Sequence, residues 1–154
     1  MADGSPLLQI RIRDGNVVII NSQIYAALIS PPNATTWIAT AADNGTIQFT
    51  DQASGQILAA PSTDPGTQAV ASPPGVALPV TTWLVTQYSD SSEDDPAPVK
   101  DPSQLTSGYY AIQEPSSGEF LYRYQIEDYS VLPKRVALQQ SDLDQAPLII
   151  RVSS

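Results

Sequence analysis

Carboxylates are the most abundant ionisable side chains in this sequence, yet their spacing does not build a reactive site. The run Glu93-Asp94-Asp95 could bind a metal ion, but it lacks the alternating ligands and the glycine of a calcium loop. Glu127 and Asp128 could form the acid pair of a glycosidase, but adjacent residues point apart and no second acid is placed at a suitable separation. We therefore expect no enzyme activity, metal or cofactor.

The composition removes further classes of chemistry. Histidine and cysteine are both absent from the 154 residues, which excludes disulfides, zinc sites built on thiolates or imidazoles, and histidine as a catalytic base. The net charge of −9 argues against binding to a nucleic acid backbone, which requires basic side chains. The N-terminal residues Met1–Pro6 resemble no secretion signal, and no apolar run, Val17–Ile20 included, approaches the roughly 20 residues of a membrane-spanning helix. We expect a cytoplasmic protein that does not bind membranes.

The elements that could position a site are short strands. Apolar runs rich in β-branched residues alternate with proline, glycine and other turn residues, and no segment shows a sustained helical period. This pattern predicts an all-β domain. The expected strands are Leu8–Arg13, Val17–Ile20, Tyr25–Ile29, Thr36–Thr40, Thr46–Thr50, Gln56–Ala59, Gln68–Ala71, Thr82–Thr86, Tyr109–Gln113, Glu119–Tyr122, Arg135–Gln139 and Leu148–Val152.

An internal repeat organises these strands into three similar units. Ser30-Pro31-Pro32 precedes Thr35-Thr36-Trp37, and Ser72-Pro73-Pro74 precedes Thr81-Thr82-Trp83. A third copy follows when the glycine turns are aligned, with Ile149 in the place of the tryptophan. Three units of four strands predict a β-trefoil with twelve short strands in three pseudo-repeats, at about residues 5–43, 44–88 and 107–154. Residues 89–106 are expected to form an exposed acidic loop, and the tryptophans to pack in the core.

Sugar binding is one function that this fold would allow. Trefoil lectins usually repeat an aromatic platform in each unit, but here the aromatic residues are unequal: the third unit has Tyr122, Tyr124 and Tyr129, and the first has Tyr25. The Gln-x-Trp element of ricin-type lectins is absent. The sequence therefore leaves open a single carbohydrate site in the third unit, with packing of the tyrosines as the structural alternative.

A family resemblance points to another function. The stretch Leu105–Val136 reads Leu105–Ile112, then Phe120–Arg123, then Glu127–Val136, and it resembles the opening repeat of the cospin-type serine protease inhibitors of mushrooms, which are β-trefoils. The motif opens the chain in that family, whereas here it lies in the last third, as a natural or engineered circular permutation would place it. The resemblance implies an inhibitor that blocks a protease cleft with a rigid loop, since preorganisation lowers the entropy cost of binding.

Three segments could carry the protease-binding loop. The resemblance maps the family's reactive loop onto Tyr124–Leu132, with Tyr124, Gln125, Ile126 and Tyr129 as contacts, and it makes Arg123, Lys134 and Arg135 structural. Lys100 is the one cation in the acidic loop, is bracketed by Pro98 and Pro102, and would suit a trypsin-like pocket, although Asp101 after it is unfavourable. Asn33, beside two prolines, could serve an asparaginyl-specific cysteine protease, as in related mushroom trefoils.

Protease inhibition, most readily of a trypsin-like enzyme, is therefore the leading hypothesis. The alternative is a carbohydrate-binding lectin with one glycan site. A third possibility is a trefoil that has lost its inhibitory loop or was rebuilt as a scaffold.

Overall fold

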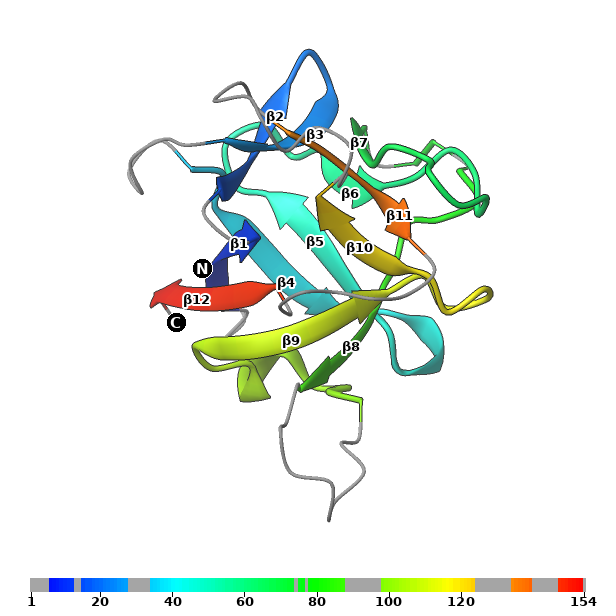
Figure 1. The fold of residues 1–154 in the computed structure, drawn as a ribbon. Coiled ribbons are helices and arrows are strands. Elements are labelled where there is room, and N and C mark those ends of the chain that lie inside the picture. Colours follow the sequence, from blue (N-terminus) through cyan, green and yellow to red (C-terminus); the bar gives the residue numbers. More distant parts are fainter. Residues whose placement is uncertain are drawn as a thin grey trace.

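The fold is all β, as the sequence predicts (Figure 1). The structure is a computed structural model, and it describes residues 6–12, 15–27, 34–73, 75–76, 78–87, 98–123, 134–139 and 147–153. These ranges contain two short 3₁₀ helices, η2 (Asp43–Gly45) and η3 (Pro102–Gln104). Their twelve strands are β1 (Leu7–Ile12), β2 (Gly15–Ile20), β3 (Gln23–Ala27), β4 (Trp37–Ala41), β5 (Ile47–Asp51), β6 (Ile57–Ala59), β7 (Val70–Ser72), β8 (Leu84–Gln87), β9 (Gly108–Gln113), β10 (Phe120–Arg123), β11 (Lys134–Gln139) and β12 (Leu148–Ser153).

Each strand matches one that the sequence predicts, with small shifts at the ends. In β1, Leu8, Ile10 and Ile12 are buried and Arg11 is exposed, which is the alternation of a strand with one face in the core. Gln9 departs from this pattern because it is also buried. No helix in the described ranges is long and apolar enough to cross a membrane.

The strand pairings repeat the same pattern three times. Six strands close a ring through the antiparallel pairs β1–β4, β4–β5, β8–β9, β9–β12 and β12–β1. The remaining link is between Ile47 of β5 and Trp83 beside β8, which exchange backbone hydrogen bonds of 2.8 and 2.9 Å. The other six strands form the hairpins β2–β3, β6–β7 and β10–β11.

The three hairpins meet one another at the end of the ring. β3 pairs with both β7 and β11, and an isolated bridge joins Gln68, just before β7, to Ala137 of β11. Each hairpin is also tied to the ring, because the first and second strands of each unit pair in β1–β2, β5–β6 and β9–β10. Closure of this kind leaves few unpaired strand edges.

The core is built in layers that the strand register defines. Trp37 and Trp83 are both fully buried, which confirms the prediction that they pack in the core. One layer contains the inward pairs Ile10–Ile149, Ala39–Phe49 and Val85–Ile112. A second layer contains Trp37 opposite Leu8 and Trp83 opposite Ile47.

The register corrects one predicted equivalence. Ile149 was expected in the place of a tryptophan, but it corresponds to Ala39 and Val85, which occupy the first layer. Pro147 occupies the tryptophan position, and its carbonyl oxygen accepts a hydrogen bond of 2.9 Å from the N–H of Tyr110. A large Tyr110 opposite a small Pro147 thus replaces the aliphatic–tryptophan pairs of the other units, and it keeps this layer filled.

Candidate functional site

Of the residues predicted to contact a protease, the described part of the chain contains Lys100. Tyr124, Gln125, Ile126 and Tyr129 fall in residues 124–133, and Asn33 falls in residues 28–33, both outside the described residues. Arg123, Lys134 and Arg135 belong to β10 and β11. The geometry of the site is therefore the geometry of the segment around Lys100.

The chain before Lys100 is fixed to the barrel. Pro98 forms a bridge with Thr86 of β8, and the N–H of Val99 donates a hydrogen bond of 2.7 Å to the carbonyl oxygen of Val85. The Val99 side chain is partly buried against the core. Pro98 and Val99 thus pair alongside β8, and Lys100 follows directly after this paired segment.

The chain after Lys100 is fixed as well. Pro102 is buried and Leu105 has no exposed surface. The 3₁₀ helix η3 begins at Pro102, and Leu105 follows its last residue. The N–H of Leu105 donates a hydrogen bond to the carbonyl oxygen of Pro102 (3.0 Å). This finding differs from the expectation of an exposed loop through residue 106. The physical reason is that Pro102 and Leu105 are apolar, and the core accepts them while the polar residues around them face solvent.

Asp101 caps η3 with its own carboxylate. Its Oδ1 accepts hydrogen bonds from the N–H (3.0 Å) and the hydroxyl (2.8 Å) of Ser103. These bonds favour the ionised form and lower the pKa of Asp101 below its ordinary value. The residue that directly follows Lys100 is thus a carboxylate whose Oδ1 atom is already bonded to Ser103.

Arg151 of β12 holds the same segment from the barrel side. Its Nη1 donates to the carbonyl oxygens of Ser103 (3.1 Å) and Leu105 (3.0 Å), and its backbone N–H donates to the hydroxyl of Ser107 (2.9 Å). Sequence reasoning missed this residue. The one available signal was a lone cation within the otherwise apolar run 148–152, and it does not indicate a partner 46 residues away in the chain.

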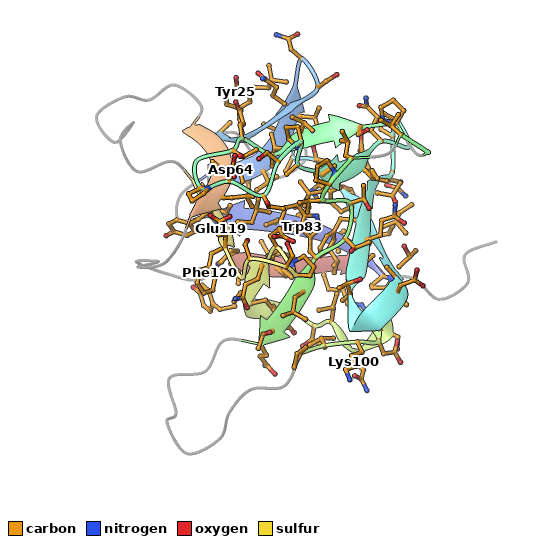
Figure 2. All side chains as sticks on the ribbon, turned by 90° about the vertical axis from the view of Figure 1, so that its right-hand side faces the viewer. Tyr25, Asp64, Trp83, Lys100, Glu119 and Phe120 are labelled. Atoms are coloured by element: carbon orange, nitrogen blue, oxygen red, sulfur yellow. The ribbon has the colours of Figure 1, made fainter. Side chains whose placement is uncertain are left out.

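The Lys100 side chain is exposed and its stem crosses a glycine. Figure 2 shows Lys100 at the edge of the molecule opposite Tyr25. A Cβ atom added to Gly45 would lie 3.2–3.3 Å from the Cγ, Cδ and Cε atoms of Lys100. Gly45 also has a φ of +75°, which favours glycine. The glycine thus leaves room for the lysine stem beside η2.

A second feature is an open hollow on another part of the surface. It has a volume of about 410 Å³ and is lined by Thr63, Pro65, Ser117 and Glu119. The hollow lies between the loop joining β6 to β7 and the turn joining β9 to β10, and Figure 2 shows Asp64 and Glu119 on this side of the molecule. No group of three or more acidic side chains in the described ranges is placed to hold a metal ion.

Glu119 is the unusual residue of this hollow because only 5% of it is exposed. One carboxylate oxygen, Oε2, accepts a hydrogen bond of 3.1 Å from the Ser117 hydroxyl. The hydroxyl oxygen in turn accepts one of 3.2 Å from the N–H of Glu119. The other carboxylate oxygen, Oε1, has no hydrogen-bond partner in the part of the chain that the structure describes. A buried acceptor in this state is rare in folded proteins.

The tyrosines expected to form a sugar platform are arranged differently. Tyr122 has no exposed surface and belongs to the core, so it cannot stack on a ligand at the surface. Tyr25 is half-buried, and its hydroxyl donates to Oε1 of Gln23 (3.2 Å). Tyr124 and Tyr129 lie outside the described residues. Among the described aromatic residues, none of those expected to bind sugar lines the hollow.

Comparison with solved structures identifies the fold type. No protein-family model and no curated protein sequence matches the chain. ThreeFoil, a designed three-fold symmetric protein, has a TM-score of 0.69 and 16% identity over 97% of this chain and 100% of its own. The cytolethal distending toxin of Actinobacillus actinomycetemcomitans has a TM-score of 0.63 and 14% identity over 100% of this chain and 97% of that one.

A mushroom protein is also similar. The Polyporus squamosus lectin, solved with a human-type influenza-binding epitope, has a TM-score of 0.63 and 12% identity, and the match covers 99% of this chain and 51% of the lectin. All three are folds of the β-trefoil type. At these identities the similarity concerns the fold.

Proposed function

We infer that the chain is a β-trefoil of three four-stranded units, at about residues 5–43, 44–88 and 107–154. Two observations support this inference. The strand pairings repeat three times around a six-strand ring capped by three hairpins. The similar solved structures, including a designed three-fold symmetric protein, have the same fold type.

We propose that the protein inhibits trypsin-like serine proteases and that Lys100 enters the specificity pocket of the target. The observation that carries the proposal is an exposed lysine on a segment held at both ends: Val99 is bonded to Val85, and Pro102–Leu105 is packed on the barrel. The resemblance of residues 105–136 to cospin-type inhibitors supports the same functional class.

The physical basis is preorganisation. A flexible loop loses conformational entropy when it binds a protease, whereas a segment already fixed by backbone bonds and by the buried Pro102 loses much less. A trypsin-like pocket carries a carboxylate that recognises a lysine or arginine side chain. Asp101 after the lysine is unfavourable for such enzymes, but its carboxylate is already engaged by Ser103, which reduces this disadvantage.

A titration against trypsin, chymotrypsin, subtilisin and a papain-like enzyme tests the proposal. We expect trypsin to be inhibited stoichiometrically at micromolar protein, and Lys100→Ala to abolish this inhibition. Arg11→Gln is the matched control, because Arg11 is an exposed cation on β1 and should leave inhibition unchanged. Lack of inhibition of all four enzymes would refute the functional class, and full inhibition by Lys100→Ala would refute the site.

A second candidate function, carbohydrate binding, is favoured by the hollow at Glu119. Glu119 lines this hollow, Ser117 and Thr63 offer hydroxyls, and Pro65 offers an apolar surface. The similar mushroom lectin binds a glycan. A glycan array tests this candidate: a hit that is lost in Glu119→Gln and retained in Lys100→Ala would place the glycan in the hollow. Absence of any hit would refute it.

A further inference from the structure

The peptide bond between Lys100 and Asp101 joins two stretches of chain that are anchored separately. On the lysine side, Val99 is bonded to Val85 (2.7 Å) and Pro98 is paired with Thr86. On the aspartate side, Asp101 is bonded to Ser103, and Arg151 is bonded to the carbonyl oxygens of Ser103 and Leu105. Neither set of contacts depends on the intervening peptide bond.

We propose that Asp101 and Arg151 are positioning residues that keep the two sides of the Lys100–Asp101 bond together, so that a serine protease which cuts the bond reseals it faster than water completes hydrolysis. This inference rests on the proposed inhibition of trypsin-like enzymes. It adds to that function an explanation of why an exposed lysine in a surface segment would make the protein an inhibitor and not a substrate.

The chemistry is a reversible acyl transfer. The hydroxyl oxygen of the protease serine attacks the carbonyl carbon of Lys100, the C–N bond to Asp101 breaks, and the serine proton is delivered through the enzyme's base to the leaving nitrogen. In the reverse step the Asp101 amine attacks the ester carbon, the C–O bond to the serine breaks, and the proton returns to the serine oxygen. Water takes the place of the amine only if the amine moves away.

The anchors decide this competition by holding the amine near the ester. An amine tethered beside an acyl carbon has a much higher effective concentration than one that diffuses. Arg151 supplies the long-range part of the tether, since its guanidinium connects η3 to β12 across 46 and 48 residues of sequence. Asp101 supplies the local part, since its carboxylate accepts two charge-assisted hydrogen bonds from Ser103.

Cleavage with catalytic amounts of trypsin tests the inference. The fraction of chain cut between Lys100 and Asp101 is followed by mass spectrometry, and residual trypsin activity is followed in the same samples. We expect Arg151→Gln and Asp101→Ala to be cut at this bond about tenfold faster than the wild type, the factor expected for loss of a charge-assisted hydrogen bond. Inhibition by these two variants should be transient.

Two conservative variants separate positioning from a general loss of stability. Asp101→Asn keeps an acceptor for the Ser103 N–H, so its cleavage rate should return to near the wild-type rate. Arg11→Gln removes a cation elsewhere on the barrel and should be cut at the wild-type rate. If Arg151→Gln does not fold, as judged by its urea unfolding curve, the comparison of Asp101→Ala with Asp101→Asn decides the question.

The outcomes distinguish the two proposals. Equal cleavage rates for wild type, Asp101→Ala and Arg151→Gln would overturn the positioning role, even if wild type inhibits trypsin. A wild type that does not inhibit, but is cut more slowly than Asp101→Ala and Arg151→Gln and at the same rate as Asp101→Asn, would overturn the proposed function and keep the positioning role. Fast cleavage of Asp101→Asn, equal to that of Asp101→Ala, would also overturn the role of Asp101.

Discussion

The two buried tryptophans of this core differ in the hydrogen bonding of the indole N–H group. Trp37 and Trp83 both have no exposed surface. The indole N–H of Trp83 donates to the carbonyl oxygen of Leu58 (3.0 Å), whereas Nε1 of Trp37 has no partner among the residues that the structure describes. The pair therefore offers a matched comparison of burial with and without a hydrogen bond.

We expect Trp83→Phe to lower the free energy of unfolding by about 1 kcal/mol more than Trp37→Phe. The loss of volume is similar in the two variants, but Trp83→Phe also leaves the Leu58 carbonyl without its donor. Urea unfolding curves of the two variants give the difference directly. Equal losses, or a larger loss for Trp37→Phe, would contradict the assignment.

The carboxylate of Glu114, at the turn after β9, makes the stability of the protein depend on pH. Burial acts to raise its pKa, but hydrogen bonds from the N–H and hydroxyl of Ser116 and from Ser117 outweigh burial and lower the pKa below its ordinary value. Because the pKa in the folded state lies below that in the unfolded state, the stabilisation is complete above the unfolded pKa. It is lost as the pH falls through the folded pKa.

Glu114→Gln should therefore reduce stability at pH 7 and flatten the decline in stability that the wild type shows as the pH falls below the ordinary pKa of a glutamate. Urea unfolding at several pH values measures both effects. Asp64→Asn, which removes an exposed acidic charge, is the control and should keep the wild-type decline. A Glu114→Gln protein whose stability still falls as steeply with acid as the wild type would refute the role of this carboxylate.

At the scale of elements, the glycine beside the Lys100 stem has a close counterpart in another turn. Gly45 and Gly55 have φ values of +75° and +80°. A Cβ atom on Gly45 would press on the Lys100 stem, whereas a Cβ atom on Gly55 would meet nothing within 4 Å. The two positions thus share a left-handed backbone conformation and differ in contact with the candidate site.

Gly45→Ala and Gly55→Ala should each lower the free energy of unfolding by about 1 kcal/mol, because both place a side chain in the left-handed region. Gly45→Ala should in addition weaken trypsin inhibition by displacing Lys100. Unfolding curves and inhibition constants of both variants provide the test. If inhibition is affected equally in the two, the Lys100 stem does not depend on the space at Gly45.

The elements could be predicted from the sequence far better than the contacts between them. Short β-branched runs separated by turns are local signals, and each predicted strand is present. The equivalence of Ile149 with the tryptophans was wrong because Pro147 carries no sequence likeness to tryptophan, and only the register reveals its position.

The candidate site could likewise be predicted from the sequence only where its signals are local. Lys100 was identified from its isolated charge and the flanking prolines, both of which are local features. The hydrogen bonds of Arg151 to Ser103 and Leu105 could not be predicted, because a contact between residues 46 or more positions apart leaves no periodic signal in the sequence. The hollow at Glu119 also joins two loops from different units, so no single segment indicates it.

At the scale of the whole molecule, the first and last strands are neighbours. β1 and β12 pair along most of their length, with Leu7 opposite Ser153 and Ile10 opposite Ile149. The Cα atoms of such partners lie only about 5 Å apart. A chain that begins at Leu105 and joins Ser154 to Met1 through a short linker should therefore fold, as domains with adjacent ends usually tolerate permutation.

This permuted chain should lose inhibition while it keeps its fold. The new ends separate Gln104 from Leu105, and the buried leucine no longer anchors the segment that carries Lys100 through the backbone. Circular dichroism and urea unfolding report on the fold, and the trypsin assay reports on the segment. A permuted chain that does not fold would argue against the displaced-repeat interpretation of the sequence. Undiminished inhibition would argue against anchoring through Leu105.

The pairing of β1 with β12 also affects how the protein is made. A ribosome produces β1 before β12, so the edge of β1 that pairs with β12 stays open until the ten strands between them have been made. Such distant pairing slows folding, and an unpaired edge can associate with other nascent chains. The ring therefore cannot close before β12 has been made, and protection of β1 by a chaperone would matter most until then.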